Sequence, residues 1–118
     1  MKYLLLLYAA PEAAEALNTS PETGQAAFQE WMTWLKEARA SGALLDNNGL
    51  APATSATTVR VRNGKTLTTD GPFAETHEQL AGYSLFECQD LDEAIAWAAK
   101  IPMARLGSVE VRPLWSGA

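Results

Sequence analysis

Residues 3–8 read Tyr3-Leu4-Leu5-Leu6-Leu7-Tyr8, an apolar run with no polar interruption. Successive side chains of a β-strand point to opposite faces, so a run without alternation predicts a strand that is covered on both sides. The run divides into two sets, Tyr3, Leu5 and Leu7 on one face and Leu4, Leu6 and Tyr8 on the other. The fold must therefore supply a cover for each face of this strand.

The first cover is a long helix. Ser20 is suited to an N-cap and Pro21 to the first helical position, while Gly42 is suited to a left-handed C-cap. These signals predict a helix from about Pro21 to Ser41. Helical spacing predicts that its buried stripe consists of Phe28, Trp31, Met32, Leu35 and Ala38.

A second helix is predicted after Asp90, with Glu93 completing a capping box and Pro102 ending the helix. Its expected buried stripe is Leu91, Ala94, Ile95 and Ala98. Trp34 and Trp97 lie off both stripes, where they either mark the edge of an interface or cover loops.

Five further strands are expected, over residues 43–50, 57–62, 65–69, 80–88 and 108–115. Asn63-Gly64 is a strong hairpin signal between the second and third of these. Val59 and Val61 alternate with Arg60 and Arg62, so that the two pairs face opposite ways.

The element order is βαββαβ enlarged by one hairpin, which predicts an α+β, ferredoxin-like fold with two helices on one face of an antiparallel sheet. The whole chain, 1–118, is expected to form one domain. Helices on one face leave the other apolar face of the first strand bare, with Val59 and Val61 adding to one of these surfaces. A second copy packed sheet to sheet would cover it, as in a dimeric α/β barrel. The alternative is that the hairpin and the C-terminal segment fold back over it.

Composition narrows the classes of function. The formal net charge of −5 opposes binding to nucleic-acid phosphates. The lone cysteine, Cys88, excludes an internal disulfide and fits a reducing compartment, and the apolar run at residues 1–8 is too short to span a membrane. The expectation is a cytoplasmic protein that binds neither nucleic acid nor membrane.

The stretch Thr69-Asp70-Gly71-Pro72-Phe73-Ala74-Glu75-Thr76 is a sharp turn. It resembles the signature of the YCII-related, DGPF-motif family of small bacterial proteins. The resemblance extends through Met1-Lys2-Tyr3-Leu4-Leu5-Leu6, residues 56–62, Gly82-Tyr83, residues 90–94 and residues 107–113. It implies a ferredoxin-like dimer of mostly unknown function. Members are often associated with genes for extracytoplasmic-function sigma factors, which implies a role in transcriptional regulation.

Shorter members of the wider group carry a His-Asp pair proposed as a catalytic dyad. Aligning the first helix on Gly42 places Trp31 and Ala40 near those positions, and neither residue transfers a proton. The dyad is therefore not carried over to this chain.

Asp70 and His77 are the candidates for acid–base chemistry. Asp70 either bonds backbone N–H groups and holds the turn, which is the favoured interpretation, or faces a pocket. His77 is the only histidine, and its polar neighbours favour a solvated surface position over a general base.

Candidate ligand-binding residues are Arg60, Arg62, Asp70, Phe73, Tyr83 and Arg112. The guanidinium groups suit a small anionic ligand if they converge, and surface ion pairs with Glu87 and Glu110 if they do not. Tyr83 and Phe73 either line a cavity or belong to the core.

One histidine and one cysteine are too few for a nitrogen–sulfur metal site, and the sequence has no phosphate loop, dinucleotide fingerprint or nucleophile elbow. No cofactor is expected. The leading interpretation is a homodimeric domain that binds a small ligand or a protein partner rather than an enzyme. The alternative is a small cofactor-free enzyme with an acid–base site at Asp70.

Overall fold

The computed structural model describes residues 1–13 and 21–115, which form an α+β fold. The strands and helices are β1 (Lys2–Ala9), α2 (Pro21–Ser41), β2 (Leu44–Gly49), β3 (Thr57–Arg62), β4 (Lys65–Asp70), β5 (Gln79–Glu87), α3 (Leu91–Ala99) and β6 (Ser108–Pro113), with 3-10 turns η1 (Ala53–Ser55) and η2 (Pro102–Arg105). The expected helix over 21–41 is confirmed. Ser20, its expected cap, lies outside the described residues.

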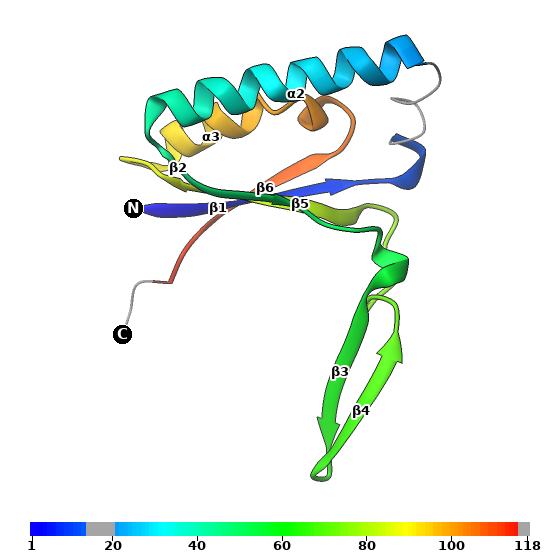
Figure 1. Ribbon diagram of the computed structural model, residues 1–118. Coiled ribbons are helices and arrows are strands. Elements are labelled where there is room, and N and C mark those ends of the chain that lie inside the picture. Colours follow the sequence, from blue (N-terminus) through cyan, green and yellow to red (C-terminus); the bar gives the residue numbers. More distant parts are fainter. Residues whose placement is uncertain (14–20, 116–118) are drawn as a thin grey trace.

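Four strands form an antiparallel sheet in the order β2-β5-β1-β6. β1 and β2 are therefore parallel with β5 between them, and β5 and β6 are parallel with β1 between them. This is the arrangement of two interlocked split βαβ units. Both helices lie on one face of the sheet, as expected (Figure 1). We call the opposite face the open face.

The core lies between the sheet and the helices. Leu5, Phe86 and Ile101 are fully buried there, together with Tyr3 and Leu7 of β1. Tyr3, Leu5 and Leu7 therefore face the helices, and the sequence-based assignment of alternate β1 residues to opposite faces is confirmed.

The buried stripe of α2 differs from the expected one. Trp34 is 3% exposed, whereas Phe28 and Met32 are 58% and 38% exposed. The helix turns toward Trp34 because that ring stacks edge-on against Phe86 and Trp97, and its Nε1 donates to the Trp97 carbonyl at 3.3 Å. The expectation that Trp34 lies off the buried stripe is therefore wrong.

The buried stripe of α3 also differs from the expected one. Asp90 is its N-cap and accepts a 2.9 Å hydrogen bond from the Glu93 N–H, as the capping signal predicts. Ala94 and Ala98 are buried, but Leu91 and Ile95 are each 48% exposed. Small alanine side chains therefore bring α3 close to the sheet.

The hairpin does not join the sheet. β3 and β4 pair only with each other, and they project from the sheet on the side of the open face (Figure 1). Asn63 and Gly64 both have positive φ, 52° and 73°, as a type I′ turn requires. We call residues 57–70 the arm. Val59 and Val61 belong to the arm, so the expectation that they extend the apolar surface of the sheet is wrong.

Candidate functional site

Asp46, Asn48 and Tyr83 form a hydrogen-bonded cluster on the open face. The Tyr83 hydroxyl donates to Asp46 Oδ2 at 2.8 Å, and the Asn48 amide donates to Asp46 Oδ1 at 3.2 Å and to the Tyr83 hydroxyl at 3.0 Å. The Asn47 backbone N–H also donates to Asp46 Oδ1, at 2.9 Å. The carboxylate thus gathers neutral donors from two neighbouring strands.

A β-bulge puts Asp46 on this face. Leu44 pairs with Phe86 on the helix side, but the register shifts before the next pair, Asp46 with Leu85. The extra residue, Leu45, reverses the direction of the side chains that follow. Asp46 and Asn48 therefore point to the open face, while Asn47 points to the helix side and accepts a 2.7 Å bond from the buried Ser84 hydroxyl.

Lateral strand pairing arranges the open face in rows. One row runs Asp46, Leu85, Leu4, Arg112, and the next runs Asn48, Tyr83, Leu6, Glu110. The leucines in the centre of both rows are half-buried. Arg112 and Glu110 pair with each other on β6. Leucines thus occupy the middle of the face, with the polar cluster on β2 and β5 to one side and an ion pair on β6 to the other.

The candidate residues from the sequence are spread over several places. Arg60, Arg62 and Asp70 lie on the arm, and Phe73, 79% exposed, follows it. Arg60 reaches no carboxylate among the described residues; its Nη2 donates to the Phe73 carbonyl at 3.4 Å, and Arg62 donates to the Val61 carbonyl. Within one copy these groups do not converge with Tyr83 or Arg112.

The DGPF turn is held by Thr58 rather than by the Asp70 side chain. The Thr58 hydroxyl donates to the Gly71 carbonyl at 2.9 Å, and the Gly71 N–H donates to the Ala56 carbonyl at 2.7 Å. The exposed Asp70 carboxylate makes no hydrogen bond or ion pair with the described residues. Gly71 has φ of 96°, which explains the glycine of the motif.

His77 is exposed at the surface, and its Nε2 lies 3.8 Å from Glu12 Oε2. His77 and Asp70 are therefore not assembled into an acid–base pair within one copy.

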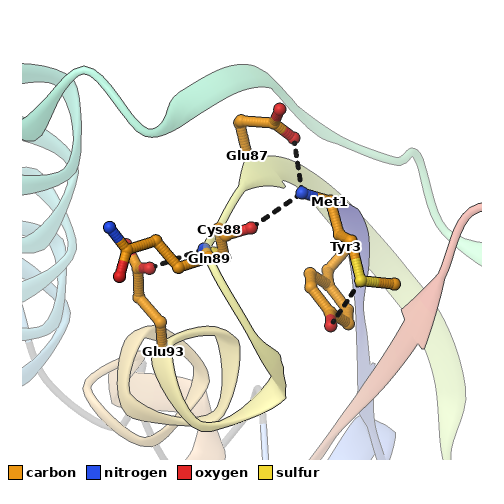
Figure 2. A network of polar contacts seen from close by, with 6 residues as sticks. All are labelled: Met1, Tyr3, Glu87, Cys88, Gln89 and Glu93. Atoms are coloured by element: carbon orange, nitrogen blue, oxygen red, sulfur yellow. Dashed lines mark hydrogen bonds and ion pairs between the residues drawn. The ribbon is translucent and has the colours of Figure 1, made fainter.

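Cys88 lies at the end of β5 beside the first residue (Figure 2). The Met1 amino group donates to the Cys88 carbonyl at 2.9 Å and lies 3.4 Å from Glu87 Oε2, while Glu93 accepts a 2.7 Å bond from the Gln89 N–H. Burial, reinforced by the Glu93 carboxylate, raises the pKa of the Cys88 thiol. The thiol is thus a neutral core group rather than a nucleophile.

A hollow of about 300 Å³ lies between α2 and η2. Its wall is mostly apolar and includes Ala27, Trp31, Met103 and Leu106. Arg105 and Glu30 line it as well and form an ion pair with each other. The hollow therefore offers apolar contact and a cation that is already neutralised.

Sequence reasoning found Tyr83 but missed Asp46 and Asn48. Both residues lie in the strand predicted over 43–50, and only the bulge at Leu45 turns them onto the same face as Tyr83. No cluster of three or more metal-ligating side chains occurs in residues 1–13 and 21–115. None of the helices described there is both long and apolar enough to cross a membrane.

The structure defines a small α+β domain whose two described long helices cover one face of the sheet. The chain belongs to the YCII-related domain family, whose model matches residues 1–116. It is also 51% identical over 67 residues to the uncharacterised protein R00369 of Rhizobium meliloti (strain 1021). That match covers 55% of this chain and 54% of the relative, so the chain matches about half of the relative's length.

Proposed function

We infer that this chain works as a homodimeric binding domain in which two copies pack through their open faces. The observation that carries this inference is the pair of rows across that face, with Leu4, Leu6 and Leu85 in the middle and no covering element among the described residues. Leucines at this position gain stability from burial, about 25 cal/mol for each Å² removed from water. A two-fold axis would set each apolar centre against another, as in a dimeric α/β barrel.

The ligand in this proposal lies between the two sheets, beside Asp46, Asn48 and Tyr83. A few convergent polar groups beside an apolar floor are the usual lining of a small-molecule site. Within the described part of the chain Asp46 accepts from neutral donors only, so the site suits a small polar ligand that offers hydrogen-bond donors or a positive charge. This differs from the anionic ligand expected from converging guanidinium groups, because those groups do not converge within one copy.

The regulatory role implied by the family resemblance extends this proposal. A dimer that changes with its bound ligand would present a ligand-dependent surface to a protein partner, such as a sigma factor. Support for this extension comes from the resemblance alone. An enzyme working at Asp70 is the less favoured function, because the Asp70 carboxylate is exposed on the arm.

Native mass spectrometry of freshly purified protein tests the proposal. We expect a dimer that carries a defined additional mass, and Tyr83→Phe should reduce the fraction that carries it. A bare dimer would favour a protein partner over a small ligand. A monomer at micromolar concentration would contradict the proposal.

Two substitutions that introduce a carboxylate test where the dimer interface lies. Leu6→Asp places a carboxylate in the centre of the open face and should convert the dimer to a monomer in sedimentation velocity. Ile95→Asp is the matched control, because Ile95 is an exposed apolar residue on α3, on the other side of the sheet. Equal dimer fractions for both variants would remove the open face from the interface.

A further inference from the structure

The arm stands away from the body of its own copy. The radius of gyration is 16.4 Å, whereas a compact chain of this length has about 13 Å. Strands of six residues give the arm a length of about 20 Å. In Figure 1 the arm extends below the sheet, on the side of the open face, as do the described residues that directly follow β6.

Nothing in the described part of its own copy covers the arm. Every residue from 59 to 70 is exposed, and Val59, Val61 and Leu67 are 59%, 60% and 48% exposed. An isolated two-stranded hairpin is marginally stable in water. Yet this one has a type I′ turn and six cross-strand pairs in register. The sequence specifies an ordered ribbon whose supporting surface must come from elsewhere.

The two sides of the arm differ in chemistry. Val59 and Val61 share one side, opposite Thr68 and Thr66, and this side carries no charge before Asp70 at its base. The other side carries Arg60, Arg62 and Lys65 around Leu67. The uncharged side is suited to burial, and the cationic side to the wet edge of an interface.

The charge of the arm points to the identity of its partner. Three cations and one carboxylate give residues 57–70 a net charge of +2, so the rest of the chain, which totals −5 with the arm, carries −7. A basic arm on an acidic body is complementary to a second copy of the same body. An exchange of arms about a two-fold axis satisfies both copies at once and closes the assembly.

We propose that each arm clasps the second copy in the dimer, with the side that bears Val59 and Val61 packed on the partner. This proposal rests on the dimer of the proposed function and adds a second interface to it. Arg60, Arg62 and Lys65 lie at the edge of that interface, where they steer association toward the acidic body. In this arrangement, contacts with the partner copy hold the arm in place, and contacts with its own copy do not.

Trypsin measures the clasp directly, because Arg60, Arg62 and Lys65 are cleavage sites on the arm. We expect cleavage there to be at least tenfold slower in the wild-type dimer than in protein diluted to the monomer or in Leu6→Asp. Cleavage after Arg105, on η2, is the internal control and should change less than threefold. Equal cleavage of the arm in dimer and monomer would overturn the clasp and leave the open-face dimer standing.

The double variant Val59→Thr, Val61→Thr tests which side is buried, and it does so without relying on Leu6→Asp to fold. Threonine keeps the β-propensity of the ribbon but removes its apolar contact. We expect the dimer dissociation constant to rise at least tenfold, with faster cleavage of the arm. Leu67→Thr, on the cationic side, is the matched control and should change the constant less than threefold. An unchanged constant for the double variant would overturn the clasp, and a monomeric wild type would overturn both the clasp and the dimer.

Discussion

The hydroxyl of Tyr83 on β5 donates a 2.8 Å hydrogen bond to Oδ2 of Asp46 on β2. The two residues are 37 positions apart in the sequence, and the bulge at Leu45 brings them to the same face. This bond is the centre of the polar cluster on the open face. It links the candidate that sequence reasoning identified to one that it missed.

Tyr83→Phe should lower the free energy of unfolding by about 0.5–1 kcal/mol, because it removes a solvent-exposed hydrogen bond and little packing. The measurement is urea denaturation at constant protein concentration. Tyr8→Phe is the matched control, since Tyr8 lies on the same face and its hydroxyl has no partner among the described residues. An equal loss in both variants would mean that the bond to Asp46 contributes nothing specific.

Thr58→Val should destabilise the arm and the turn more than Asp70→Ala does. Thr58 bonds the Gly71 carbonyl, so its loss should cost about 1 kcal/mol, whereas the exposed Asp70 carboxylate should contribute less than about 0.5 kcal/mol. The readouts are thermal unfolding and amide exchange of residues 57–71. A larger effect at Asp70 would restore the turn-holding role that its place in the motif predicts.

Gly107→Ala should cost more than about 2 kcal/mol or prevent folding. A Cβ on Gly107 would lie 2.1 Å from the carbonyl oxygen of Tyr8, so β6 could not approach β1 without a shift of the backbone. Gly49→Ala is the control, because a Cβ there meets no atom within 4 Å. The measurement is the midpoint of urea unfolding, and similar midpoints for the two variants would contradict the close approach.

Cys88 should make stability fall at alkaline pH. Burial raises the pKa of its thiol in the folded protein, so the neutral form contributes stability that is complete below the pKa of the thiol in the unfolded chain. That contribution is lost as the pH rises through the raised folded value. Cys88→Ala should flatten this part of the profile of unfolding free energy against pH.

The same burial should slow alkylation of the native thiol. At pH 8 we expect iodoacetamide to label Cys88 at least tenfold more slowly in the native protein than in urea. Rapid labelling of the native protein would show that the end of β5 opens readily, and would contradict the buried position of the thiol.

The sequence was most informative where local rules decide the structure. Asn63-Gly64 predicts a type I′ turn because both positions need positive φ, and Asp90 with Glu93 predicts the start of α3 because a side-chain oxygen caps free N–H groups. It was less informative on which helical residues are buried. Helical spacing placed Phe28 in the buried stripe and Trp34 outside it, whereas Trp34 is the buried residue because its ring packs on Phe86 of β5.

By itself, then, the sequence determined the order of the elements, the bounds of α2, the start of α3, the assignment of alternate β1 residues to opposite faces and the turn of the hairpin. Each of these follows from contacts within a few residues or from the alternation of a strand. Only the tertiary structure decided that the arm leaves the sheet, that a bulge carries Asp46 to the side of Tyr83, and that Arg60, Arg62 and Arg112 stay apart. Those outcomes depend on strand register and on packing between distant segments, where a shift of one residue moves a side chain to the opposite face.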